Sequence, residues 1–298
     1  MSQDKAQESA PAPYAAEFVD MPHPSWTPGT PQPMPFPGAP IDASAWHSLP
    51  PSELEPSHAY SLMISCIVPR PIALVSSCSE DGAVNVSPYS YFNAMGHAPP
   101  IICIGINRAA SRGGAKKDTL NNIEATGSFV VNIMSDWFIE AANHCCGDFP
   151  PEVDEMALAG LHPVPSVKVK APRLAESAIH MECKLRQVVD ITNAEGKPST
   201  AIVIAEVVVF HVHHGVTTKS PTGKLVVDPV ALAPISRMGG TTYARTTQLF
   251  DIGRPSAAQA QLGPADYTRP HVQQPAAGAA TAEAAAVKSA SGQFSTLS

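Results

Sequence analysis

The sequence predicts a mainly β fold, an antiparallel barrel with short peripheral helices. Short apolar runs recur between turn residues, as they do in all-β domains. These runs lie at 71–78, 101–106 and 129–134. Two further segments, 179–187 and 201–212, have the pattern of long paired strands. Because the helical stretches between them are few and short, this spacing indicates a barrel.

The two long segments differ in how they must be covered. Segment 179–187 alternates apolar and polar residues, so one face lies in the core and the other in solvent. Its apolar side comprises Ile179, Met181, Cys183 and Leu185. Segment 201–212 is apolar on both faces. One face fills the barrel, and a helix or a second subunit covers the other, so a homodimer is expected.

The first part of the barrel contains a bend and a hairpin. We expect the apolar run 63–68 to be a strand, separated from 71–78 by a bend at Pro69-Arg70-Pro71. The sequence Glu80-Asp81-Gly82 predicts a hairpin turn, with glycine supplying a positive φ, before a short strand at 83–86.

Two helices are predicted between the central strands. The first covers 120–125, is capped by Asp118 or Thr119, and is ended by Gly127. The second covers 135–146. A turn at 193–196 then joins the two long strands.

The ends of the chain differ from its middle. Twelve of the 31 prolines lie in residues 1–51, and Ala, Gln, Ser and Gly dominate after about Ser256. Neither end has apolar residues in a periodic pattern. We therefore expect a disordered Pro-rich extension over 1–45, one folded domain over 46–255, and a disordered Ala-rich tail over 256–298.

The overall composition argues against several classes of partner and of protein. A net charge of −7 argues against a nucleic-acid or anionic-membrane partner. No apolar run reaches the ~18 residues of a membrane helix, and the first residues lack the pattern of a secretory signal. The six cysteines form no CxxC pair, which favours reduced thiols and a cytoplasmic location.

Three segments have the residues of a binding site. Segment 85–93 mixes hydroxyls, amides and aromatic rings, which suit a planar heteroaromatic ligand, although an aromatic-rich turn capping the barrel fits as well. Segment 107–119 places four cations around Gly113-Gly114 before a helix start, as a phosphate site does; a solvated basic loop is the alternative. Segment 234–245 carries paired glycines between Arg237 and Tyr243, and suits either a pocket lid or a tight turn.

Other clusters have simpler explanations. The HVHH sequence at His211, His213 and His214 has no carboxylate shortly after it, so a strand end is expected there rather than a metal site. The adjacent Cys145 and Cys146 make poor zinc geometry. Glu206 interrupts an apolar strand face and is expected to pair with an arginine. No nucleophile elbow, P-loop or GxGxxG motif is present.

Together these segments resemble the FMN-binding split β-barrel family of flavin reductase-like domains, in its flavoprotein oxygenase-associated branch. The resemblance runs from about Tyr60 to Pro255. It rests on SPYSYFNA, KKDTLNNIEATGSFVVNI and VDPVALAPISRMGGTTYAR, which occur in the family's order.

The resemblance implies a set of cofactor-binding residues. Those around the flavin ring are Asn85, Ser87, Pro88, Tyr89, Ser90, Tyr91, Phe92 and Asn93. Those around the ribityl chain and phosphate are Arg108, Ser111, Arg112, Lys116, Lys117, Asp118 and Thr119. Arg70, Arg237 and Tyr243 are implied to complete the pocket from either subunit of a homodimer. No catalytic side chain and no metal ligand is identified.

The resemblance further implies an FMN-dependent oxidoreductase, with FAD as the alternative flavin. It would pass a hydride from NAD(P)H to flavin and then to a small-molecule acceptor. Some members carry Gly-Asp-His for the nicotinamide, whereas this chain has Gly147-Asp148-Phe149. Direct action on a small organic substrate, and electron carriage without NAD(P)H turnover, therefore stay open as alternatives.

Overall fold

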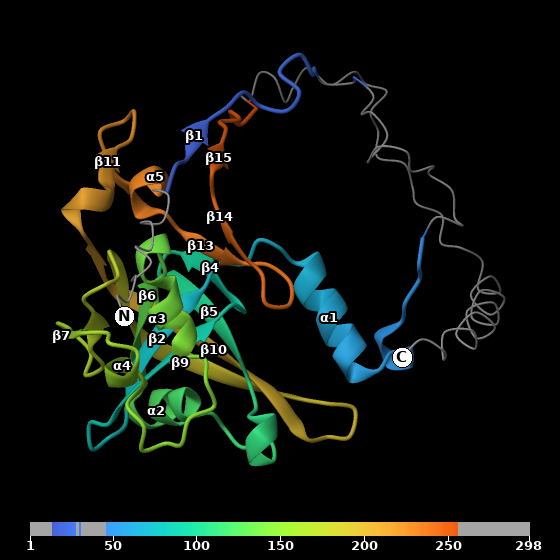
Figure 1. Cartoon of the computed structure of the whole chain (residues 1–298), viewed down its shortest axis with the longest axis vertical. Helices are drawn as coiled ribbons and strands as arrows, with labels where there is room; N and C mark the ends of the chain where they lie inside the picture. The colour runs from blue at the N-terminus through green and yellow to red at the C-terminus, as the bar shows by residue number, and fades with distance from the viewer. Residues whose placement is uncertain (1–13, 28–29, 31–45, 256–298) are drawn as a thin grey trace, which may run out of the picture. The chain divides into compact units, whose positions relative to one another are not determined.

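The computed structural model describes residues 14–27, 30 and 46–255 (Figure 1). Most of the two expected terminal extensions lies outside these residues. Within the first extension, β1 (Glu17–Phe18) pairs in parallel with β15 (Gln248–Leu249).

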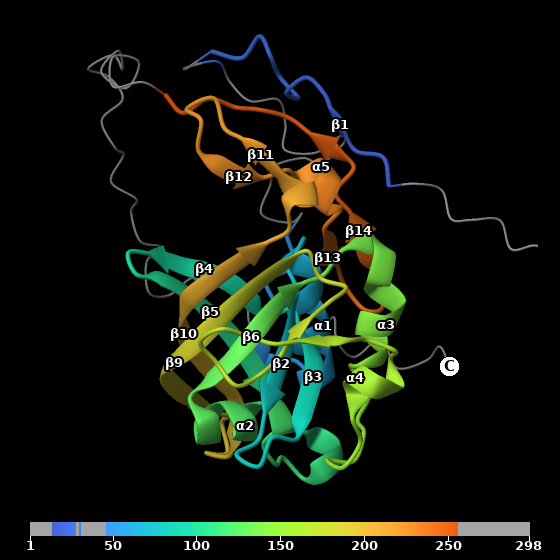
Figure 2. The same cartoon turned by 90° about the vertical axis from the view of Figure 1, so that its left-hand side faces the viewer.

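The domain is organised around a seven-stranded antiparallel sheet of order β3-β2-β6-β9-β10-β5-β4. Figure 2 shows these strands side by side. Their bounds are β2 (Ala73–Cys78), β3 (Val84–Tyr89), β4 (Phe92–His97), β5 (Pro100–Asn107), β6 (Ser128–Ile133), β9 (Ile179–Thr192) and β10 (Pro198–Val212). The mainly β prediction is confirmed. Within the described residues the hydrogen-bonded order runs from β3 to β4 without closing on itself.

The remaining elements are short. The helices are α1 (Pro56–Cys66), α2 (Asp118–Thr126), α3 (Ile139–His144), α4 (Glu155–Leu158) and α5 (Pro229–Leu232). Single 3-10 turns lie at Pro51–Glu53, Ala110–Arg112, Asp136–Phe138 and His214–Val216. Three two-stranded ribbons are β7 (Pro163–Val164) with β8 (Arg173–Leu174), β11 (Thr217–Lys219) with β12 (Leu225–Val227), and β13 (Ile235–Arg237) with β14 (Tyr243–Arg245).

The main core lies between the concave side of the sheet and α2. Phe129 of β6, Ile104 of β5 and Val203 of β10 are fully buried there, with Leu120 of α2 above them. Burying such a side chain contributes roughly 1.5–3 kcal/mol. In β10 alternate residues are buried, as the period of a strand requires. The intervening residues, among them Ile202 and Ile204, stay half-exposed on the outer face.

The prediction of a strand over the apolar run 63–68 is wrong, because most of this run belongs to α1. A short apolar run does not by itself distinguish a strand from a helix. Pro56 occupies the first helical position, where a missing N–H costs nothing. The hydroxyls of Ser61 and Ser65 donate to the carbonyls of Ser57 and Ser61, one turn earlier.

The bounds of several other predicted elements differ from the observed bounds by a few residues. The strand expected at 83–86 continues to Tyr89, so Pro88 lies within β3; β3 is an edge strand, where a missing donor is tolerated. The prediction that Asp118 or Thr119 caps α2 is wrong, because both lie inside the helix and its N-cap, Lys117, makes no side-chain cap; Gly127 ends the helix with φ 66° as predicted. The helix expected at 135–146 is a 3-10 turn followed by α3. No helix in the described ranges combines the length and apolarity needed to cross a bilayer.

A buried carboxylate fixes the connection before β8. Glu182 of β9 is fully buried. It accepts hydrogen bonds from the backbone N–H groups of Val167, Lys168 and Val169 at 2.7, 2.6 and 3.2 Å. His211 Nε2 donates a fourth bond at 2.6 Å. Because all four partners are donors, they require the ionised form of the carboxylate.

These donors set the pKa of Glu182. Burial on its own raises the pKa, but the donors of Val167, His211 and Lys168 outweigh it, so the folded pKa lies below the ordinary value. A lowered folded pKa stabilises the fold at pH values above the ordinary pKa. That stabilisation is lost as the pH falls through the folded value.

We therefore predict that Glu182→Gln lowers the free energy of unfolding at pH 7 by about 3 kcal/mol, because an amide turns N–H groups toward N–H donors. The variant should also lose less stability than the parent between about pH 5 and pH 3. Urea unfolding at several pH values measures both effects. Glu195→Gln, at an exposed turn carboxylate, should change stability by less than about 0.5 kcal/mol. Equal effects of the two variants would contradict the prediction.

Candidate functional site

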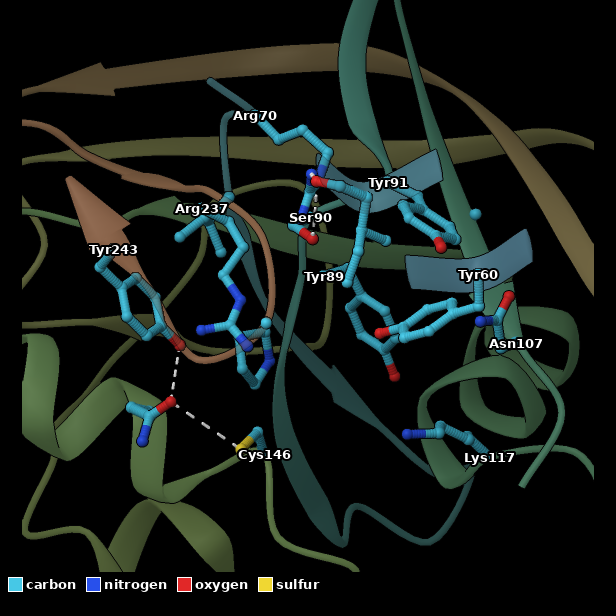
Figure 3. A pocket seen from close by; sticks show the side chains of 16 residues that line it. Tyr60, Arg70, Tyr89, Ser90, Tyr91, Asn107, Lys117, Cys146, Arg237 and Tyr243 are labelled. Atoms are coloured by element: carbon cyan, nitrogen blue, oxygen red, sulfur yellow. Dashed lines mark hydrogen bonds between the residues drawn. The ribbon is translucent and has the colours of Figure 1, made fainter. Parts of the chain in front are cut away.

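One cavity of about 260 Å³ brings together segments far apart in the sequence (Figure 3). Its walls come from α1, the end of β3, the end of β5, the start of α2, the end of α3 and the β13–β14 hairpin. Its volume is close to the lower limit of ordinary small-molecule sites.

The cavity is strongly cationic although the chain is acidic. Arg70, Lys117 and Arg237 line it, and none of the lining residues is Asp or Glu. Among the described residues no carboxylate lies within ion-pair distance of these three side chains. A concave site lined by one sign of charge concentrates ligands of the opposite sign. The charge of its lining residues therefore favours an anionic ligand in this cavity.

Arg70 joins the walls of the cavity at its base. Its side chain is 6% exposed. The guanidinium donates to the carbonyls of Ile64 and Ile67 at the end of α1 and, at 2.7 Å, to the carbonyl of Met238 after β13. A further bond, 3.3 Å long, joins Nε to Ser90 Oγ. One buried cation thus connects three segments through neutral acceptors.

Tyrosines form much of the remaining wall. Tyr89 is 7% exposed, and its hydroxyl has no hydrogen-bond partner among the described residues. Burial raises the pKa of Tyr89, so the phenol keeps its proton. A buried hydroxyl without a partner costs about 1–3 kcal/mol, which a ligand acceptor would recover. Tyr91 and Tyr60 lie nearby in Figure 3.

A close approach fixes Tyr91 in place. A side chain at Gly105 of β5 would put its Cβ 3.1 Å from Tyr91 Cβ, too near for a normal contact. The backbone N–H of Gly105 also donates to the Tyr91 carbonyl at 2.7 Å. Glycine at this position lets the 90–91 turn lie directly against β5.

The basic loop before α2 is mostly neutralised by carboxylates. Arg108 pairs with Asp190, and Lys116 pairs with Glu124. Arg112 lies 2.9 Å from Asp118 and donates to the Phe149 carbonyl. Arg112 is also 3.5 Å from Asp148, which accepts a bond from Ser111. Of the loop's four cations only Lys117, immediately before α2, lines the cavity.

Behind the cavity wall lies a polar chain. Thr119 Oγ1 donates to Asn85 Oδ1 at 2.6 Å, and Asn85 Nδ2 donates to Glu155 Oε1 at 2.8 Å. Burial raises the pKa of Glu155. Asn85 and Thr119 therefore support the wall, and neither is part of its surface.

The structure brings together part of the predicted site. Eight predicted residues line the cavity: Arg70, Pro88, Tyr89, Ser90, Tyr91, Lys117, Arg237 and Tyr243. The other ten do not: Asn85, Ser87, Phe92, Asn93, Arg108, Ser111, Arg112, Lys116, Asp118 and Thr119. Phe92 packs against the main core, and Asn93 Oδ1 accepts from the next backbone N–H.

Sequence reasoning missed eight lining residues: Tyr60, Ile64, Ile72, Gly105, Asn107, Asn143, Cys146 and Gly240. Ile64 was missed because the run 63–68 is predicted to be a strand, and no pattern in the sequence marks Tyr60, which lies before that run, as a lining residue. Asn143 lies in α3 and Cys146 just after its end, and no local pattern marks either as a neighbour of Tyr243. Tyr243 Oη donates to Asn143 Oδ1 at 2.6 Å.

The histidines, the glutamate and the cysteine that were considered as other possible sites have structural roles. His211 bonds to Glu182, and His213 Nδ1 accepts from the Gly215 N–H. Glu206 pairs with Arg186, as predicted. Burial raises the pKa of Cys145 to about 12, which makes it an unreactive thiol.

Fold and site together define a mainly β protein with a cationic, tyrosine-walled cavity beside an antiparallel sheet. The particular family follows from comparison with known proteins. The chain belongs to the flavin reductase-like family, since the family model for the flavin reductase like domain matches residues 64–229. Membership implies a flavin cofactor and an oxidoreductase activity.

Several relatives align over nearly their whole length. An uncharacterized protein of Halalkalibacterium halodurans is 36% identical over 71% of this chain and 98% of its own. Nitrilotriacetate monooxygenase component B from Bacillus cereus is 34% identical, with a TM-score of 0.64, covering 70% and 98% of the two chains. The 2-nitrobenzoate 2-nitroreductase of Pseudomonas fluorescens is 30% identical, with a TM-score of 0.61, covering 71% and 98%.

We predict that Arg70→Lys lowers the free energy of unfolding by about 3 kcal/mol, because one ammonium cannot reach carbonyls on both α1 and the loop after β13. Chemical denaturation measures the change. Arg245→Lys provides the matched control, since Arg245 makes an exposed pair with Asp136 and should lose at most about 1 kcal/mol. Similar losses in both variants would contradict the role given to Arg70.

Proposed function

We propose that the protein is an FMN-dependent oxidoreductase of the flavin reductase-like kind, which takes a hydride from NAD(P)H and passes electrons to a small-molecule acceptor. One observation carries the proposal. Three cations without carboxylate partners and four tyrosines line the same cavity, which has no acidic residue in its wall.

The residues present fit a phosphorylated flavin. Lys117 stands at the start of α2, where free backbone N–H groups and the helix dipole favour a phosphate. The 88–91 segment supplies an apolar and aromatic surface for a flat ring. The unpartnered Tyr89 hydroxyl supplies a buried donor. Bound FMN would supply the two-electron chemistry, and FAD is the alternative flavin.

The protein's own contribution is binding, orientation and charge. Arg70, Lys117 and Arg237 favour negative charge in the cavity, and Tyr60 of α1 covers one side of it. The wall contains no carboxylate or histidine, and no residue is assigned a proton-transfer role.

A second candidate is direct action on a small organic substrate. In this chain the position after Gly147-Asp148 is Phe149, whose ring lies against Gly147 and 5.5 Å from the His144 ring. The Asp148 carboxylate is held by Ser111 and Arg112. A relative at 30% identity is described as a nitroreductase. Electron carriage without nicotinamide turnover is the third possibility, with FMN bound in all three.

We predict that Lys117→Ala weakens FMN binding by about tenfold or more, because it removes a charged partner of the phosphate. Riboflavin, which lacks the phosphate, should bind the variant and the parent protein about equally. Fluorescence titration with both flavins measures the ratio. Lys116→Ala is the matched control, since this neighbouring lysine pairs with Glu124 outside the cavity.

A parent protein that fails to bind FMN would overturn the proposed function. Equal losses for riboflavin and FMN would overturn the role of Lys117. Anaerobic titration of the FMN-loaded protein with NADH and NADPH then tests the nicotinamide step, because an electron carrier without nicotinamide turnover is not rapidly reduced by either of them.

We also propose a homodimer. The outer face of β10 presents Ile202, Ile204 and Val208 half-exposed, and Phe210 is 56% exposed at its end. Apolar residues gathered on one face favour association with a second copy. A cytoplasmic location is proposed on the six free cysteines.

We predict a native mass of twice 31.3 kDa by light scattering. Phe210→Asp should shift the mass toward the monomer, because it places a charge in the apolar face. Leu225→Asp, at a more exposed apolar residue on β12, should leave the mass unchanged. A monomeric parent protein would contradict the prediction.

A further inference from the structure

The guanidinium of Arg237 has no partner within the part of the chain that the structure describes. Its side chain makes no hydrogen bond and lies near no carboxylate. It packs over the ring of Tyr243, with Cζ 4.4 Å from the ring centre. By contrast Arg245, on the paired strand of the same hairpin, is bound to Asp136. The hairpin thus leaves one of its two arginines available to a ligand.

The groups around Arg237 are donors and a flat apolar surface. The Tyr243 hydroxyl donates a hydrogen bond to Asn143 Oδ1, which orients the Asn143 amide, and the amide NH₂ has no partner in the described residues. The Tyr243 ring holds the guanidinium from one side, and both residues line the cavity. A guanidinium fixed against a ring presents two parallel N–H groups, the arrangement that suits a carboxylate.

Arg237 and Lys117 lie on opposite sides of the cavity. In Figure 3 the ring of Tyr89 lies between them, with Lys117 toward α2 and Arg237 toward the β13–β14 hairpin. If Lys117 binds the phosphate of the cofactor, as proposed above, the charge of Arg237 remains for a second anion. This step rests on the proposed function.

We propose that Arg237, Tyr243 and Asn143 form a subsite for the carboxylate of a planar aromatic acid, bound in the same cavity as the flavin. A single guanidinium matches the single charge of a carboxylate. The ring of Tyr89, which lies between Arg237 and Lys117 in Figure 3, offers a surface for the flat body. The subsite sets which small molecules enter, and thus defines a substrate class for the proposed oxidoreductase.

The test uses the FMN-loaded protein, with benzoate as the probe and benzamide as its neutral counterpart. Binding is followed by the change in the flavin's visible spectrum and by calorimetry. Benzoate should bind about tenfold more tightly than benzamide, because only benzoate gains a charged pair with Arg237. Arg237→Gln should remove this preference, and Arg237→Lys should retain part of it. Arg245→Gln, the matched control, should leave the preference intact.

The outcomes separate the two proposals. Failure of the parent protein to bind FMN overturns the proposed function. Normal FMN binding with equal affinity for benzoate and benzamide overturns the subsite alone. An Arg237→Gln variant that loses FMN affinity instead assigns this arginine to the cofactor. Loss of NADH affinity with unchanged benzoate preference assigns it to a nucleotide phosphate. Both results overturn the subsite.

Discussion

The buried guanidinium of Arg70 is the interaction on which the cavity depends. It carries a full charge at 6% exposure, and its partners are backbone carbonyls and one hydroxyl. A buried charge is tolerated only when its donors are satisfied, so the three segments supplying these acceptors must meet at this point. The end of α1, the turn after β3 and the loop after β13 thereby become walls of one site. Figure 1 shows that loop beside α1.

The distribution of charged side chains makes the cavity cationic. The protein is acidic overall, and carboxylates pair with three of the four cations in the loop before α2, namely Arg108, Arg112 and Lys116. Lys117 and Arg237 have no such partners in the described residues. These two cations face the same cavity, so they concentrate anionic ligands there, and they are the partners proposed for a flavin phosphate and for an acidic substrate.

Much of the sheet was predictable because strand periodicity is local. The alternation over 179–187 and the apolar runs at 101–106 and 129–134 correspond to β9, β5 and β6. The left-handed cap at Gly127 followed from glycine's freedom at positive φ. The strand predicted around Ile64 is wrong, because a short run of apolar and small residues fits either the helix or the strand period. In the structure it is helical, and its end contacts Arg70 and the distant Gly239.

By itself the sequence determined the family, the mainly β class and three of the segments that line the cavity, because these follow from residue type and order. Tertiary structure decided which side chains face the cavity. Lys116 and Lys117 are adjacent and chemically identical, yet Lys117 lines the cavity whereas Lys116 pairs with Glu124 outside it. Asn143 joins Tyr243 across 100 positions of chain. Such contacts depend on how the sheet and its helices pack, and no local pattern encodes them.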